Sequence, residues 1–218
     1  MQIKNIILEL HKRQPIKKIL HLGAHLGNEI EFYKTLNPEL IYWFEANPEL
    51  IPELTKNVLK HNIKEQKVFN YAVSAQSKKT SFNLIYSNDR TNTGCSSLME
   101  LKEHSKQYPH IKKVKTIEVE SVNIDEFLTN NGLSTDFDYV NMDIQGSEFE
   151  VLNSSKILFN DSPKTRIFQL ETCQVEMYDG QKLESDIIEF MSTKGYSRIH
   201  YHVWAHNWGD SLFYNSSL

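Results

Sequence analysis

The sequence predicts an α/β fold built on a mostly parallel sheet, with helices on both faces and a C-terminal antiparallel hairpin. Short apolar runs alternate with segments of helical periodicity over residues 17–73 and again over residues 137–193, which is typical of parallel βαβ units. The first run ends in a tight turn between two glycines, and the second run ends in an acidic residue. Residues 196–204 and 211–214 are predicted to form the two strands of the hairpin.

The N-terminal half is predicted to begin with an amphipathic helix within residues 1–15. Apolar residues recur there at helical spacing from Ile3 to Leu10, and Pro15 ends the pattern. Asn47-Pro48 marks the start of a later helix, because asparagine caps helices and proline suits their first turn. The predicted elements are strand 17–22, helix 29–36, strand 40–44, a helix that ends at residue 61, and strand 67–73.

The alternation of predicted strands and helices is interrupted in the middle of the chain and then resumes. Residues 87–110 are polar, lack periodicity and lie between two predicted strands, 80–86 and 112–122. Loops this long in a compact domain are usually functional, so residues 87–122 are predicted to form one side of a ligand site. The remaining predicted elements are helix 123–128, strand 137–142, a helix from Gly146, strand 165–170 ending in Glu171, helix 183–193 and hairpin strands 196–204 and 211–214.

Bulk composition is that of one soluble globular domain spanning residues 1–218. The net charge of −4 and the lack of a basic stripe argue against a nucleic-acid partner. Two cysteines without metal-type spacing favour a reducing compartment, and no apolar run approaches the roughly 20 residues of a membrane span. The N-terminus lacks the long apolar region of a signal peptide, so we expect a cytoplasmic protein.

The turn after the first strand is predicted to bind a nucleoside. Gly23 and Gly27 allow a sharp bend and a close approach of a ligand to the backbone. Glu45 lies 22 residues after Gly23, at the end of the second strand, where nucleotide-binding sheets hold ribose hydroxyls. The spacing between the glycines is not the dinucleotide pattern that cradles a pyrophosphate, so a nucleoside without phosphates fits better.

Four acidic residues, Glu45, Asp143, Glu148 and Glu171, lie at or just after predicted strand ends. Ligands of open α/β sheets bind outside the carboxyl ends of the strands. Each carboxylate alone fits a helix cap or a solvated charge, but burial of several without partners is costly. The set therefore predicts ligand hydroxyls, amines or a cation at this edge of the sheet.

Several ordered motifs resemble those of FkbM-type methyltransferases. These motifs are HLGAHLGNE at 21–29, FEANP at 44–48, NYAVS at 70–74 and DIQGSE at 143–148, with weaker blocks GCSSL at 94–98 and VNIDEFL at 122–128. The resemblance covers roughly residues 18 to 172 and is specific in combination. It implies a class I, S-adenosylmethionine-dependent enzyme with a Rossmann-like, seven-stranded sheet. The chain departs from the family pattern at His21, where aspartate is more usual, and at Gln145, where glutamate is more usual.

The resemblance also implies residue roles. Backbone amides near Gly23, Ala24 and Gly27 would approach the methionine end of the cofactor, Glu29 its amino group, Glu45 the ribose, and residues 70–72 the adenine. Asp143 would lie beneath the transferred methyl group. The full expected cofactor set is Gly23, Ala24, His25, Gly27, Glu29, Glu45, Ala46, Asn70, Tyr71, Ala72 and Asp143, and the expected substrate set is Ser96, Ser97, Glu148, Glu171 and Trp204.

Methyl transfer needs a positioned acceptor and a base that takes its proton. The candidate bases are Asp143, His202 and His206. Asp143 and Glu171 are also the candidate ligands of a divalent cation that would orient a sugar diol, although two carboxylates are a sparse ligand set. A zinc site built on the C-terminal histidines is less favoured than hairpin packing.

We therefore expect a methyltransferase that acts on the hydroxyl of a sugar in a glycan or a secondary metabolite. One alternative is N-methylation of a small amine or amide, and another is a non-catalytic nucleotide-binding module. The expected partner is a small-molecule or glycan acceptor. Its pocket is expected to form from the irregular residues 87–110 and the C-terminal hairpin, so that residues 87–122 are the acceptor side. The sequence leaves the oligomeric state open.

Overall fold

The computed structural model describes residues 2–88, 93–159, 165–205 and 207–217. A seven-stranded sheet forms its centre, with strand order β3-β2-β1-β7-β8-β10-β9. The strands are β1 (Lys18–Leu22), β2 (Leu40–Phe44), β3 (Glu65–Phe69), β7 (Tyr139–Met142), β8 (Ile167–Cys173), β9 (Ser197–Ala205) and β10 (Trp208–Tyr214).

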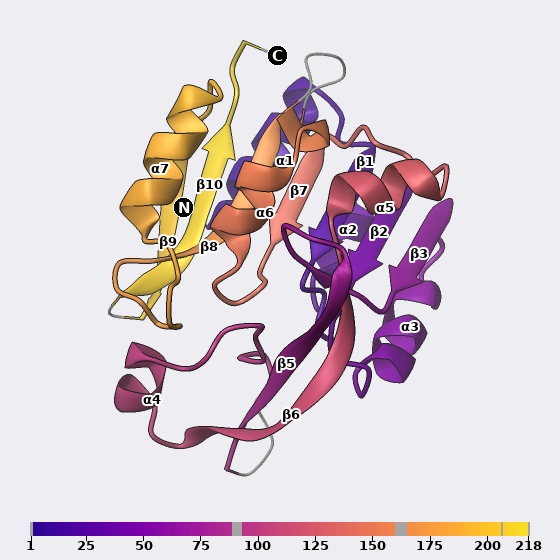
Figure 1. The fold of residues 1–218 in the computed structure, drawn as a ribbon. Helices are drawn as coiled ribbons and strands as arrows, with labels where there is room; N and C mark the ends of the chain where they lie inside the picture. The colour runs from indigo at the N-terminus through magenta and orange to yellow at the C-terminus, as the bar shows by residue number, and fades with distance from the viewer. Residues whose placement is uncertain (1, 89–92, 160–164, 206, 218) are drawn as a thin grey trace.

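The strand pairing confirms the predicted fold class. Strands β3, β2, β1, β7 and β8 pair in parallel, whereas β10 pairs antiparallel with both β8 and β9. The parallel strands β1, β2 and β7 end at the same edge of the sheet (Figure 1). The loops that follow these strands therefore meet at one place.

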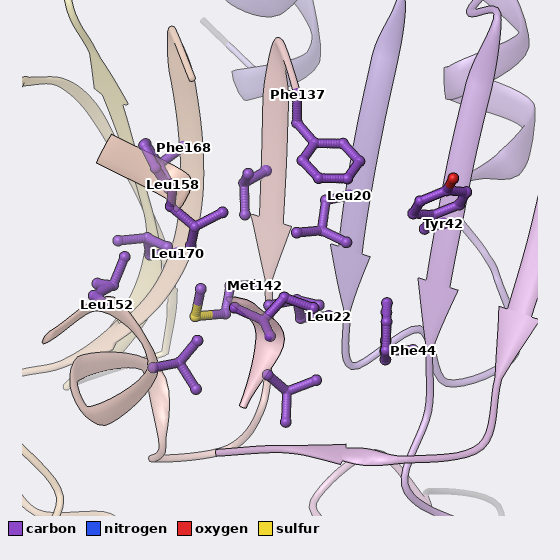
Figure 2. Packing of buried hydrophobic residues seen from close by; sticks show 14 of the residues in the cluster. Leu20, Leu22, Tyr42, Phe44, Phe137, Met142, Leu152, Leu158, Phe168 and Leu170 are labelled. Atoms are coloured by element: carbon purple, nitrogen blue, oxygen red, sulfur yellow. The ribbon is translucent and has the colours of Figure 1, made fainter. Parts of the chain in front are cut away.

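Helices cover both faces of the sheet because alternate strand residues are apolar on each side. On one face, Leu20, Phe44 and Phe168 belong to a buried cluster with residues of three helices (Figure 2). On the other face, Ile19 and Trp43 belong to a second cluster. The first face carries α5 (Ile124–Asn130), α6 (Glu148–Ser154) and α7 (Glu184–Thr193), and the second carries α1 (Ile3–Arg13), α2 (Ile30–Thr35) and α3 (Ile51–Leu59).

A smaller, three-stranded sheet extends from the edge where the parallel strands end. It consists of β4 (Ala72–Val73), β6 (Ile111–Val122) and β5 (Lys78–Ser87), in that order. The long β5–β6 ribbon passes across the carboxyl ends of the parallel strands, and α4 (Glu103–Gln107) lies beside it (Figure 1). The segment predicted to form the acceptor side therefore faces the predicted ligand site.

Two predicted strands have different bounds in the structure. The single strand expected over 67–73 is two strands, since β3 pairs with β2 and β4 pairs with β6 in the other sheet. The strand expected to end at residue 170 continues to Cys173, because β10 pairs with it as far as Trp208. Glu171 therefore lies within β8, opposite Asp210, and not at the end of the strand.

None of the helices in the described part of the chain is long and apolar enough to span a bilayer.

Candidate active site

A cavity of about 550 Å³ lies at the carboxyl ends of the parallel strands, and Phe82 of β5 and Ile111 of β6 also line it. Ligand sites of small molecules commonly have volumes of ~300–1,000 Å³. The structure brings most of the predicted site residues to this cavity from distant parts of the chain. Those that line it are Gly23, Ala24, His25, Glu29, Glu45, Ala46, Tyr71, Ala72, Ser96, Asp143, Glu171 and Trp204.

The glycine turn after β1 is packed directly against the loop after β7. Gly23 has a φ of +84°, and a Cβ at this position would lie 1.8 Å from the backbone oxygen of Asp143. The amides of Gly23 and Ala24 both donate to the Phe44 carbonyl, at 2.9 and 2.8 Å. Gly23 thus holds three strand ends together at the floor of the cavity.

Gly27 is required by packing against α3 and not by the loop after β7. Its φ is +72°, and a Cβ there would lie 2.6 Å from Val58 Cγ1 in α3. Gly27 does not line the cavity, so its glycine is explained by packing between the turn and α3.

The buried Glu45 carboxylate organises the backbone around the cavity. Its Oε2 accepts a hydrogen bond from the His25 amide at 2.8 Å, and its Oε1 accepts one from the Asn47 amide at 2.7 Å. Burial raises the pKa of Glu45, while these backbone amides oppose the shift. Each carboxylate oxygen has a second lone pair, so Glu45 retains acceptor capacity toward the cavity.

The expected adenine-side residues divide into two groups. Tyr71 and Ala72 line the cavity, whereas Asn70 does not. The Asn70 side-chain amide donates to the backbone oxygens of Glu45 and Ala46, at 2.9 and 3.2 Å. Asn70 therefore fixes the loop that carries Glu45.

Asp143 and Glu171 meet at the centre of the cavity through the side chain of Gln145. The Gln145 Nε2 donates to Asp143 Oδ1 at 2.5 Å and to Glu171 Oε2 at 2.8 Å. Asp210 lies across from Glu171 on β10 and accepts hydrogen bonds from Trp204 Nε1 at 3.0 Å and Gln169 Nε2 at 3.2 Å. The three carboxylates of Asp143, Glu171 and Asp210 thus accept hydrogen bonds from uncharged side chains, which are two amides and an indole.

Burial raises the pKa of each carboxyl group in this cluster. Asp143 is exposed to the cavity, but the protein around the cavity still buries its carboxyl group, and this burial raises its pKa. The charge of the nearby Asp210 raises the pKa of Asp143 further. Burial, followed by the charge of Asp143, raises the pKa of Glu171 well above its ordinary value. Carboxylates that share a site cannot all ionise easily, so the cluster binds protons or other cationic groups readily.

Two of the expected substrate residues support the loop after β7. The Ser97 Oγ donates to the backbone oxygen of Gln145 at 2.6 Å, and its side chain is buried. Glu148 accepts hydrogen bonds from the amides of Ile144 and Gly146 at 2.9 and 3.0 Å. Neither residue lines the cavity, so both shape the loop that carries Asp143.

The C-terminal hairpin contributes less than the sequence predicts. Trp204 lines the cavity and is 57% exposed, but His202 does not line it and instead packs edge-on against Trp204, with ring centroids 4.3 Å apart. His206, the other histidine predicted as a base, lies outside the described residues.

The structure also shows site residues that the sequence reasoning missed. The Tyr178 hydroxyl donates to Gln145 Oε1 at 2.6 Å, and His104 lies beside Tyr178 with ring centroids 5.7 Å apart. Asp210 was missed because β10 begins at Trp208, three residues before the expected strand. Its signal was an acidic residue directly before an apolar run, whereas Tyr178 lies in a loop without periodicity.

No group of three or more histidine, cysteine, aspartate or glutamate side chains suited to a metal ion occurs in the described part of the chain. The two expected ligands, Asp143 and Glu171, are connected through an amide nitrogen. Glu29 also lines the cavity, and neither lysine nor arginine does so among the described residues.

The buried Glu148 predicts a pH-dependent stability. Burial raises the pKa of Glu148 from 4.5 to about 7, so the folded protein binds a proton there that the unfolded chain releases. Stability should therefore fall as the pH rises from about 4.5 to about 7, by about 3 kcal/mol if Glu148 acts alone. Urea unfolding at pH 4.5 and pH 8 measures this difference.

Glu148→Gln should make the dependence weaker and leave the part due to Asp143 and Glu171, whose pKa values are also raised. The exposed Glu53→Gln in α3 should leave the dependence as in the wild type. A Glu148→Gln protein with the full wild-type pH dependence would show that another group causes it.

Comparison with known proteins identifies the family. The family model described as methyltransferase FkbM domain matches residues 21–198. Among solved structures, magnesium protoporphyrin IX methyltransferase from Synechocystis PCC 6803, with bound SAM, has a TM-score of 0.55 at 11% identity, over 98% of this chain and 76% of that one. Precorrin-6y C5,15-methyltransferase from Geobacter metallireducens GS-15 has a TM-score of 0.51 at 12% identity, over 97% of this chain and 86% of that one.

At these identities the two structures show a shared fold alone. No curated protein matches the chain. The family model spans most of the chain, including the glycine turn, Glu45 and the Asp143–Glu148 loop. The chain therefore belongs to the methyltransferase FkbM domain family.

Proposed function

We propose that the protein transfers the methyl group of S-adenosylmethionine to a hydroxyl of a small acceptor, most simply a sugar of a glycan or a secondary metabolite. The observation that carries the proposal is the charge of the cavity. Glu29, Glu45, Asp143, Glu171 and Asp210 line it, and no described lysine or arginine does.

This charge suits the cofactor. S-adenosylmethionine carries a sulfonium and an ammonium group, both cationic, and its nucleoside has no phosphate. A phosphate-bearing cofactor would instead favour cationic side chains, whereas the helix that begins after the turn, α2, carries the anionic Glu29 at its start. The cavity thus favours a cationic nucleoside over a nucleotide.

The placement of residues supports an ordered arrangement of the cofactor. The ribose would lie at Glu45, the adenine near Tyr71 and Ala72, and the amino acid end at the glycine turn near Glu29 and His25. This arrangement directs the methyl group toward Asp143. The likeness to a SAM-bound methyltransferase structure is consistent with it.

The proposed reaction needs little covalent chemistry from the protein. The bond between sulfur and the methyl carbon breaks as the bond between the acceptor oxygen and that carbon forms, and the sulfur keeps the electron pair. The acceptor proton passes to the ionised form of Asp143 or Glu171, and the raised pKa of each makes it a stronger base than an ordinary carboxylate. Positioning the two reactants supplies much of the remaining rate, on the order of 7–11 kcal/mol in good model systems.

The acceptor side combines carboxylates with aromatic rings. Trp204, Trp208 and Tyr108 line the cavity beside Asp210 and Glu171. Aromatic faces stack on the apolar face of a sugar, while carboxylates accept hydrogen bonds from its hydroxyls. The same carboxylates would also bind a protonated amine, which keeps N-methylation as the second candidate.

Two tests separate these functions. Isothermal titration with S-adenosylhomocysteine should show binding, and failure to bind this product or S-adenosylmethionine would favour a non-catalytic module. A screen with labelled methyl donor over sugars, nucleotide sugars and amines should label hydroxyl acceptors. Labelling of amines alone would overturn the proposed acceptor class.

Glu45→Gln is expected to weaken S-adenosylhomocysteine binding by 10- to 100-fold, or about 1.4–2.8 kcal/mol. Backbone amides donate to both carboxylate oxygens of Glu45, at 2.7 and 2.8 Å. The variant replaces one of these acceptor oxygens by an amide nitrogen, which is a donor and cannot accept. Titration calorimetry measures the change, and thermal unfolding shows whether the fold persists.

The exposed Glu53→Gln removes the same charge from α3 and should bind as the wild type does. Unchanged affinity in Glu45→Gln would place the ribose elsewhere.

A further inference from the structure

The side-chain amide of Gln145 lies between two carboxylates in a fixed orientation. Its Nε2 is 2.5 Å from Asp143 Oδ1 and 2.8 Å from Glu171 Oε2, so both N–H groups are used. Its Oε1 accepts a hydrogen bond from the buried Tyr178 hydroxyl at 2.6 Å. A rotated amide would direct its oxygen at both carboxylates and lose the hydrogen bonds to Asp143 and Glu171.

The backbone of Gln145 is held as firmly as its side chain. Its φ is +54°, a strained value that residues other than glycine adopt only where their surroundings enforce it. The Ser97 hydroxyl donates to its carbonyl at 2.6 Å, and a Cβ on the next residue, Gly146, would lie 3.3 Å from Tyr178. The surrounding residues therefore impose this position on Gln145.

A neutral amide at this position changes what the carboxylate pair can bind. Two neighbouring carboxylates ordinarily share a proton or bind a divalent cation, which needs several oxygen ligands at about 2.0–2.6 Å. Here a nitrogen occupies the space between them and supplies no lone pair. No hydrogen bond from a described residue reaches Asp143 Oδ2 or Glu171 Oε1, so each carboxylate retains one acceptor oxygen.

We propose that Gln145 is a positioning residue whose amide fills the place of a divalent cation between Asp143 and Glu171, so that this pair binds two neighbouring acceptor hydroxyls directly and without a metal. The assignment of the hydroxyls rests on the proposed function. The absence of a cation at the pair does not, because it follows from the hydrogen bonds of Gln145 alone. An acceptor with adjacent hydroxyls, as in a sugar ring, fits the two remaining oxygens.

The first test measures metal binding without any activity. Wild type, Gln145→Glu, Gln145→Ala and the control Gln14→Glu are titrated with manganese(II) chloride alone by calorimetry. Gln14 is exposed at the end of α1, so its variant adds the same charge far from the cavity. Gln145→Glu supplies a third carboxylate and Gln145→Ala removes the amide, so both should bind manganese at least tenfold more tightly than the wild type and Gln14→Glu.

Equal manganese affinity in the wild type and both Gln145 variants, including no binding by any of them, would overturn the proposal. The alanine variant keeps the experiment decisive if the glutamate variant does not fold. This result stands whether or not the protein transfers methyl groups.

The second test uses methyl transfer to an acceptor found by the screen. Chelator should leave wild-type turnover unchanged, whereas Gln145→Glu should lose turnover and regain it with added manganese. The KM for the acceptor should rise at least tenfold in Gln145→Ala, while the KM for S-adenosylmethionine changes less. Loss of wild-type turnover on chelation, or equal rises in both KM values, would contradict the positioning role.

Discussion

Gly23→Ala is expected to abolish cofactor binding and to destabilise the protein by about 4 kcal/mol or more. The added Cβ would lie 1.8 Å from the Asp143 carbonyl oxygen, a backbone atom that cannot move without displacing the loop after β7. The left-handed φ of +84° adds strain of its own. Titration with S-adenosylhomocysteine and urea unfolding measure the two effects.

Gly180→Ala provides a matched control. Gly180 has nearly the same φ, +81°, but a Cβ there would meet no atom within 4 Å. The two variants therefore share the conformational cost and differ in the contact. We expect Gly180→Ala to lose only about 1 kcal/mol. Similar losses in both variants would show that the contact between the two loops is unimportant.

Asp143→Asn is expected to lower turnover by about 10²–10⁴-fold while changing S-adenosylhomocysteine affinity by less than tenfold. Asparagine keeps an oxygen that accepts the hydrogen bond from Gln145, but it cannot take up the acceptor proton. Labelled methyl transfer measures turnover. The exposed Asp179→Asn removes a carboxylate outside the cavity and should retain wild-type turnover.

The pH profile gives an independent check on the same residue. Burial raises the pKa of Asp143, so the ionised form that accepts a proton becomes populated only as the pH rises through that raised value. Wild-type turnover should therefore increase with pH across this range. Turnover of Asp143→Asn within tenfold of the wild type, with the same profile, would remove Asp143 from the reaction.

The fold was predictable because the spacing of apolar residues along the sequence indicates which side of each helix or strand is buried. Strand β2 is apolar at every position and fully buried, and α3 carries its apolar residues on one side. The ends of strands were less predictable, because pairing partners decide them. Glu171 lies within β8 only because β10 continues alongside it to Trp208, a contact between residues 35 positions apart.

The site was predictable where the backbone itself imposes a residue type. Gly23 could be recognised because a sharp turn with a close loop contact requires glycine, and Glu45 because it follows the second strand 22 residues later, and both line the cavity. Gln145 and Tyr178 could not, since their roles arise from side chains that meet across separate loops. The sequence located Asp143 at the site but gave no sign of the amide beside it.

The β5–β6 ribbon has an evolutionary consequence. It forms one wall of the cavity, yet its strands pair with each other and with short β4, while the glycine turn and Glu45 belong to the central sheet. Insertions and deletions in the part of this ribbon that does not pair with β4 can therefore accumulate without disturbing how the methyl donor is held. Divergence among relatives should be concentrated here, and exchange of residues 78–122 between two of them is a rational route to altered acceptor choice.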